Sequence, residues 1–249
     1  HLDDEKADFD NTVREAKHHF GNNVTVIQYP LQQGEGFHAI IDVLRMTMYK
    51  FKDTGGKPEK LAIPPEEKEK ADLLHKELIE AVAGNDETLM EKYFEKGELD
   101  EDEIKTGMKK AMINHDLFPL FCLSAERNMG SGRLMGFIDN VCPSANEMPP
   151  QGSTKGEDIG CDASKPVCAF VYKAISEPHV GELSFMKVFS GTLKSGMDLI
   201  NETTGVSEKL NQLFVMEGNK RNNVSELSAG DIGATLKLKN THVNNTLHE

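Results

Sequence analysis

The stretch from Val167 to Asn240 constrains the fold of this chain more than any other part of the sequence. Two short β-rich runs, Val167–Lys173 and Leu183–Phe189, place largely apolar side chains on both faces of an extended strand. Turn-forming residues separate these runs and the later ones, at Pro178–Gly181, Ser190–Gly191, Ser195–Gly196, Thr203–Gly205, Gly218–Lys220 and Ala229–Asp231. Short strands with such turns predict an all-β barrel or sandwich. Apolar residues on both faces favour a closed barrel with one side covered.

A long and nearly gapless series of residues within this stretch also follows a known pattern. The series comprises Phe170–Ile175, Pro178, Gly181, Leu183–Phe185, Val188–Gly191, Leu193, Gly196, Leu199, Met216, Asn219–Arg221, Val224, Leu227 and Ala229–Ala234. It resembles the second domain of elongation factor G, with one departure at Met197–Asp198, where the family often has Asp directly after the Gly. The resemblance implies an all-β barrel of the translation-factor domain II type.

Helix and strand patterns alternate upstream of the barrel, which predicts an α/β fold. We expect helices at residues 9–20, 66–83, 86–94, 100–114 and 132–141, and strands at residues 24–29, 37–44, 47–51 and 117–123. Asp8 is an expected N-cap, and Asp100 with Glu103 approximates a capping box. The continuous apolar run Leu117–Leu123 is typical of a strand buried on both faces, although Pro119 weakens that pattern.

The last of these helices and the segment after it mark the boundary between two regions. Leu134, Phe137, Ile138 and Val141 are expected to be buried. The following residues are rich in Pro, Gly, Ser and charge, which is typical of a linker. We therefore expect an α/β region at residues 1–145, with an inserted α+β subdomain at about 30–112. A linker at 146–164 and the barrel at 165–249 would follow.

Charge and cysteine usage limit the classes of partner and compartment. The chain has 28 Lys and Arg against 41 Asp and Glu, a net charge of −13. Broad nonspecific binding of nucleic acid needs many cations, so only a local basic patch remains possible. The four cysteines form no Cys-x-x-Cys pair and the histidines show no ligand spacing, so we expect reduced thiols and no metal site.

No apolar run reaches membrane-spanning length. We expect a cytoplasmic monomer without a membrane partner. The chain starts without an initiator Met and stops just after the barrel, which suggests an excised piece of a longer protein.

The first half also resembles elongation factor G, in the part of its GTPase domain that follows the guanine-recognition motif Asn-Lys-x-Asp. His1-Leu2-Asp3 would place Asp3 at the Asp of the motif and His1 at its Lys. Ser124-Ala125-Glu126 lies where the family has a Ser-Ala-Lys/Leu loop. The resemblance thus implies a guanine site made by His1, Asp3, Ser124 and Ala125. Without it, an Asp near a terminus is usually just solvated, and Ser-Ala after a strand means little.

The chemistry of guanine suits this hypothesis. One carboxylate can accept both the N1–H and the exocyclic amine of guanine. Such a charge-assisted bond contributes about 1.5–3 kcal/mol, roughly ten- to a hundredfold in selectivity over adenine. The backbone N–H of Ala125 could donate to guanine O6. His1 is shorter than the family Lys, and Glu126 adds negative charge near a polyphosphate, so nucleotide binding could be altered.

The elements that bind phosphate and magnesium are missing from the sequence. No Gly-x-x-x-x-Gly-Lys-Ser/Thr occurs, and Asp53-Thr54-Gly55-Gly56 fits Asp-x-x-Gly only by letter. We therefore expect GTP or GDP and Mg²⁺ only in a longer protein that resembles a GTPase. This chain should bind neither cofactor alone, contains no catalytic residue and should not hydrolyse GTP.

The resemblance also implies the ribosome as partner, through two surfaces. Glu69, Asp72 and Glu80 lie on a charged helix face of the inserted subdomain, which would meet the ribosomal stalk protein. Lys220 and Arg221 lie in a basic turn of the barrel, which would meet small-subunit ribosomal RNA and protein. A solvated acidic face and an ordinary hairpin tip remain the alternatives.

The favoured function is that of a fragment of an elongation-factor-G-like factor, a divergent paralogue, that binds the ribosome and GTP and promotes translocation of tRNA and mRNA. A ribosome-protection or release-type relative shares the same two domains. A non-catalytic ribosome-binding module with a decayed nucleotide site is an alternative of another class, supported by His1 and Glu126.

Overall fold

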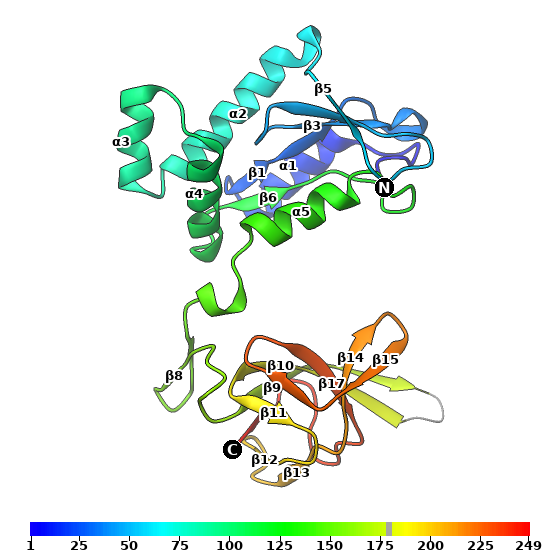
Figure 1. Cartoon of the computed structure of the whole chain (residues 1–249), viewed down its shortest axis with the longest axis vertical. Helices are drawn as coiled ribbons and strands as arrows, with labels where there is room; N and C mark the ends of the chain where they lie inside the picture. The colour runs from blue at the N-terminus through cyan, green and yellow to red at the C-terminus, as the bar shows by residue number, and fades with distance from the viewer. Residues whose placement is uncertain (178–180) are drawn as a thin grey trace. The chain divides into compact units, whose positions relative to one another are not determined.

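The computed structural model describes residues 1–177 and 181–249 (Figure 1). The predicted turn at Pro178–Gly181 lies, except for Gly181, outside the described residues. The chain divides into two compact units, His1–Pro143 and Ser144–Glu249, which we describe separately.

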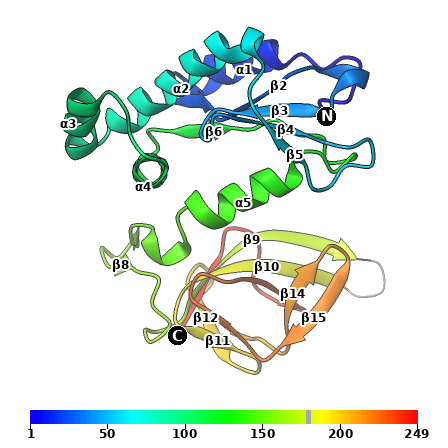
Figure 2. The same cartoon turned by 45° about the horizontal axis from the view of Figure 1, so that its top comes forward.

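A parallel pair of strands forms the centre of the first unit. β1 (Val24–Val26) pairs in parallel with β6 (Phe118–Leu120), with Val24 opposite Phe118. Helices α1 (Phe9–Phe20) and α5 (Ser131–Val141) lie beside this pair in both cartoons (Figures 1 and 2). The prediction of a strand at Leu117–Leu123 buried on both faces was only partly right. The strand is three residues long, and Pro119 at its centre has no N–H to donate to a ladder. Phe118 is 38% exposed, so the strand is not buried on both faces.

A four-stranded antiparallel sheet is inserted between β1 and β6. Its order is β2 (Gln28–Pro30), β3 (Ala39–Asp42), β4 (Thr47–Lys50) and β5 (Glu59–Leu61). The single strand predicted at residues 24–29 is divided at Ile27. The Ile27 N–H donates to Leu120 O (2.9 Å), while its carbonyl accepts from Val43 N (2.9 Å). Ile27 therefore joins the parallel pair to the inserted sheet.

Three helices complete the inserted part: α2 (Lys68–Ala83), α3 (Glu87–Lys96) and α4 (Glu101–Ile113). The predicted caps are present: Asp8 accepts from Asn11 N at the start of α1, and Asp100 with Glu103 forms a full capping box at α4. Short 3₁₀ turns, η1 (Gly34–Gly36) and η2 (Pro65–Glu67), lie after β2 and before α2. Residues of both sheets and of the helices share one core, which includes Val26, Ile40, Leu78, Ile104, Met108, Leu117 and Phe137.

One burial prediction in α5 was wrong. Phe137 and Val141 are buried and Leu134 is partly buried, but Ile138 is 48% exposed. Its neighbour Met135 is 64% exposed. The buried stripe of α5 is therefore narrower than the sequence pattern predicted.

The second unit is the predicted all-β barrel. One sheet has the order β13 (Ser207–Lys209), β12 (Asp198–Asn201), β18 (Thr246–His248), β9 (Cys168–Glu177), β10 (Gly181–Ser190), β17 (Ile232–Leu236), β14 (Leu213–Glu217) and β15 (Lys220–Val224). A second pair consists of β11 (Thr192–Lys194) and β16 (Glu226–Ser228). The strands wrap around a core that includes Val171, Met186, Val188, Leu199, Leu213 and Leu247 (Figure 2). A smaller cluster of Leu183, Phe214 and Ala234 lies apart from it, so apolar residues occupy both faces of β10, as expected.

Residues 146–164, predicted to be a linker, are part of the second unit. They begin within η3 (Ala145–Glu147) and include a small hairpin of β7 (Gln151–Gly152) and β8 (Asp158–Ile159). Gly191 N donates to Asp162 O (2.9 Å), and Lys155 Nζ lies 2.9 Å from Glu202 Oε1. These contacts join residues far apart in sequence, so the local amino-acid composition of the segment could not predict them.

Among the described residues, no helix is long and apolar enough to cross a membrane. No cluster of three or more His, Cys, Asp or Glu side chains in those ranges could hold a metal ion. All four cysteines are free thiols, and Cys122 is the buried one.

Candidate nucleotide-recognition site

The amino-terminal segment is fixed against the inserted part of the first unit. Leu2 is buried in the core, and its carbonyl accepts from Gly34 N (2.7 Å). Asp4 N donates to His1 O (3.2 Å), and Ala7 N donates to Asp4 O (2.9 Å). Asp3 therefore lies between two anchored neighbours, with 13% of its side chain exposed.

The loop from Ser124 to Met129 is closed by its own backbone. Ser124 N donates to Met129 O and Met129 N donates to Ser124 O, each at 2.9 Å. The buried Ser124 Oγ accepts from Arg127 N (3.2 Å). Ala125 and Glu126 are exposed at the tip of the loop. The loop thus holds the Ser124 side chain inward and presents Ala125 outward.

The structure brings Asp3 and Ser124 together. The hydrogen bond from the Ser124 hydroxyl is the main cause that lowers the pKa of the Asp3 carboxyl below its ordinary value, and it outweighs the opposite effect of burial. Asp3 Oδ1 is buried and has no hydrogen-bond partner among the residues that the structure describes. A buried acceptor without a donor is costly, so this atom is suited to receive an N–H group from a ligand. His1 is exposed.

Arg127 belongs to this site and the sequence analysis missed it. Its Nε lies 3.8 Å from Asp3 Oδ2, and its side chain is 41% exposed. An ion pair of this length and exposure contributes little to stability. The sequence shows Arg127 directly after Ser124-Ala125-Glu126. It does not show the direction of the Arg127 side chain, so the contact with Asp3 could not be predicted.

The Asp53-Thr54-Gly55-Gly56 loop contacts the backbone of the Ser124–Met129 loop. Gly56 N donates to Asn128 O (2.9 Å). Gly55 has a φ of +70°, and a Cβ there would lie 1.9 Å from Arg127 O, so the position requires glycine. The resemblance of these letters to Asp-x-x-Gly therefore reflects a close backbone contact between two loops.

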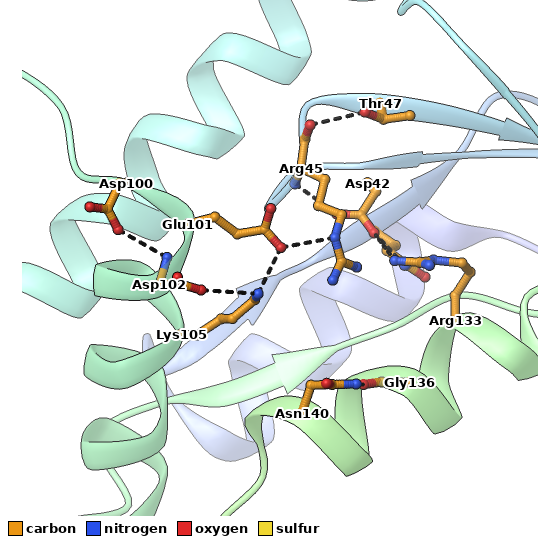
Figure 3. A network of polar contacts seen from close by, with 11 residues as sticks. Asp42, Arg45, Thr47, Asp100, Glu101, Asp102, Lys105, Arg133, Gly136 and Asn140 are labelled. Carbon is orange, nitrogen blue, oxygen red and sulfur yellow. Dashed lines mark hydrogen bonds and ion pairs between the residues drawn. The ribbon is translucent and has the colours of Figure 1, made fainter.

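A polar network connects the inserted part to the helix that follows the Ser124 loop (Figure 3). Asp42 is 2% exposed and accepts from Arg45 N (2.9 Å) and Gln28 Nε2 (3.0 Å). Arg133 Nη2 of α5 lies 3.5 Å from Asp42 Oδ2. Arg45 Nε donates to Glu101 Oε1 of α4 (3.0 Å), so β3, α4 and α5 are linked by charge. Buried charges need such partners.

The predicted contact residues lie at two other surfaces. Glu69, Asp72 and Glu80 are all exposed on α2, with Leu73 58% exposed among them and Lys76 Nζ 3.7 Å from Glu80. On the barrel, Lys220 is 73% exposed and 3.9 Å from Glu217, and Arg221 is partly covered.

The residues present fit the guanine base of a nucleotide but not its phosphates. Asp3 and the Ser124 loop supply acceptor and backbone groups beside one another. The sequence supplies no phosphate-binding loop and no magnesium ligands of the GTPase type. The fold defines a class: an α/β unit with an inserted four-stranded sheet and three helices, followed by an all-β barrel.

Two comparisons with known proteins agree with this architecture. The family profile described as elongation factor G domain 2 matches residues 166–249. The crystal structure of ttk003000868 from Thermus thermophilus is similar, with a TM-score of 0.78 and 26% identity over 99% of this chain. This chain spans 34% of the length of that protein. Residues 166–249 therefore match the elongation factor G domain 2 family, and nearly the whole chain is similar in fold to part of the Thermus thermophilus protein.

Proposed function

We propose that this chain supplies the guanine-recognition end of a GTPase domain and the second-domain barrel of a longer factor. That factor would bind the ribosome and GTP in the cytoplasm and promote movement of tRNA and mRNA. The observation that carries the proposal is the contact of Asp3 with Ser124 and Arg127. These residues lie near the beginning and the end of the first unit in sequence.

Base recognition would follow from the chemistry of these groups. The Asp3 carboxyl, whose pKa lies below the ordinary 3.8, is ionised at neutral pH, so both oxygens accept. Asp3 Oδ1 would take a guanine N–H, and the Ala125 N–H at the loop tip would donate to guanine O6. Each charge-assisted bond would contribute about 1.5–3 kcal/mol. Bound GTP, with Mg²⁺, would supply the switch between two states of the longer factor.

Calorimetry on the intact factor tests the proposal. GTP should bind about ten- to a hundredfold more tightly than ATP, because adenine offers no N–H pair to Asp3. Asp139→Ala, an exposed change on α5, should keep this preference. Equal affinities for GTP and ATP would refute the guanine site.

The barrel would contact ribosomal RNA through Lys220 and Arg221. Each phosphate contact releases counterions, so Lys220→Ala/Arg221→Ala should reduce the dependence of ribosome binding on salt by about one to two units of log–log slope. Lys6→Ala/Arg14→Ala removes the same charges from exposed positions in the first unit and should leave the slope unchanged. Equal slopes for both double variants would contradict this contact.

The exposed face of α2 would meet a basic stalk domain. Reversing Glu69, Asp72 and Glu80 to Lys should slow ribosome-dependent GTP turnover of the intact factor, since electrostatic complementarity speeds association. Reversing Glu5, Asp10 and Glu15 near α1 changes the net charge equally and serves as the control. Equal turnover in both variants would favour a merely solvated acidic face.

A non-catalytic ribosome-binding module is the second candidate, favoured by Arg127. This cation lies against Asp3 and would compete with guanine for the same carboxylate. Ribosome binding without measurable affinity for GTP would support this candidate over the first.

A further inference from the structure

A cavity of about 390 Å³ lies in the first unit, between the end of β4, the β4–β5 connection and the start of α5. Tyr49, Phe51, Lys57, Lys60, Asn128 and Arg133 are among the residues that line it. Cavities of 300–1,000 Å³ are the usual size for small-molecule sites. Neither the guanine hypothesis nor the ribosome contacts use this cavity.

Aromatic and apolar side chains form its inner wall. Phe51 is 5% exposed and Tyr49 is 2% exposed. The Arg133 guanidinium carbon lies 4.2 Å from the Tyr49 ring centroid, in cation–π geometry. Asp42 Oδ2 lies 3.5 Å from Nη2 of that guanidinium (Figure 3). The wall is therefore a flat, fixed surface rather than a set of mobile side chains.

The charged side chains that line the cavity, within the described residues, are all cationic. Lys57 and Lys60 are exposed at its edge, and within the described ranges neither makes an ion pair. Arg133 forms an ion pair with Asp42, and its buried Nε has no hydrogen-bond partner in the described part of the chain. Glu59 precedes Lys60 on β5 and so projects from the opposite face of the strand. Of the residues described by the structure, no Asp or Glu lines this cavity.

We propose that the cavity binds a small anion attached to a flat ring, an aryl phosphate or aryl carboxylate. The ring would lie on the wall formed by Phe51 and the Arg133–Tyr49 stack. The anion would lie between Lys57 and Lys60. Because Asn128 lines the cavity and belongs to the same closed loop as Ser124, the bound ring would touch the guanine-recognition loop from behind.

Titration of the 249-residue chain with 1-naphthyl phosphate tests the proposal, followed by NMR and by calorimetry. The amide signals of Gly56, Asn128 and Gly132 should shift together in a saturable way. Naphthyl phosphate should bind about tenfold or more tightly than inorganic phosphate or 1-naphthol, since each half supplies only one of the two interactions.

Matched charge variants separate the cavity from general attraction of anions. Lys57→Gln/Lys60→Gln should weaken binding of naphthyl phosphate about tenfold or more. Lys6→Gln/Lys17→Gln, on and before α1, should leave the affinity unchanged. Both pairs avoid the core, so folding is preserved. Equal weakening in both pairs, shifts elsewhere on the chain, inorganic phosphate binding as tightly as the aryl ester, or no binding at millimolar probe would each overturn the proposal.

Discussion

The environment of Asp3 in the amino-terminal segment lowers the pKa of its carboxyl group. Its carboxyl pKa is held below the ordinary 3.8 by the Ser124 hydroxyl, with a smaller contribution from Arg127. A lowered pKa in the folded state means that the ionised form stabilises the fold. This stabilisation is fully present above the ordinary pKa and is lost as pH falls through the lowered one.

Asp3→Asn should therefore make the first unit less stable at neutral pH and less sensitive to acid. Urea denaturation followed by amide exchange in residues 1–143, at about pH 7 and about pH 3, measures both effects. Asp139→Asn on the exposed face of α5 is the control and should behave like wild type. An unchanged response to acid in Asp3→Asn would show that the Ser124 bond does not form.

Cys122 should be the least reactive thiol of the four. Burial, with a smaller effect of the nearby Asp42 charge, raises its pKa well above the ordinary value, so the reactive thiolate is scarce. Burial also raises the pKa of Cys142 and Cys168, but less strongly. Iodoacetamide labelling at about pH 8, read by peptide mass spectrometry, should spare Cys122 until urea is added. Early labelling of Cys122 in the native chain would contradict this.

The sequence allowed Asp3, Ser124 and Ala125 to be proposed together, because a family pattern preserves their order along the chain. The structure confirms only that Asp3 and Ser124 meet, and their role remains a prediction. Arg127 was missed because the direction of a side chain in a loop depends on contacts such as Gly56 N to Asn128 O. Those contacts join residues far apart in sequence, which no local pattern encodes.

At the scale of elements, the crossing of α2, α3 and α4 depends on Gly107. A Cβ at this position would lie 2.3 Å from Val82 Cγ1 and 2.6 Å from Leu89 Cδ1. Gly107→Ala should destabilise the first unit by about 1–3 kcal/mol through overpacking, although Ala favours a helix by up to about 1 kcal/mol.

Gly136 in α5 provides the matched control, because a Cβ there would meet no atom of the described residues within 4 Å. Gly136→Ala should stabilise the unit by about 0.5–1 kcal/mol. Urea denaturation of both variants gives the comparison. A stabilising effect of Gly107→Ala would mean that the three helices do not cross as closely as described.

Helix ends were predictable because their causes are local. Asp8 and Asp100 cap their helices as expected, since a capping side chain bonds to residues two or three positions away. Strands were less predictable, because their length depends on a partner. The division of residues 24–29 at Ile27 and the shortness of β6 follow from pairing between distant segments.

At the scale of the whole chain, the second unit was the easier prediction. Several of its turns contain glycines with positive φ, such as Gly191 (φ +77°) and Gly218 (φ +58°). Glycine favours such turns, so the glycines in the sequence made the turns predictable. The first residue of the unit was harder to predict. Thr192 Oγ1 donates to Ala163 O (3.1 Å), so the segment expected to be a linker is packed on the barrel. Composition alone cannot distinguish such a segment from a free linker.

The central claim, that Asp3 selects guanine in a longer GTP-binding factor, is tested most directly by exchanging the base. Xanthine carries a carbonyl oxygen where guanine carries its amine, so the amide of Asn can donate where a carboxylate would repel. Calorimetry on the intact factor should show GDP binding at least about tenfold more tightly than xanthosine diphosphate in wild type, and the reverse preference in Asp3→Asn. An Asp3→Asn factor that still prefers GDP as strongly as wild type would contradict the claim.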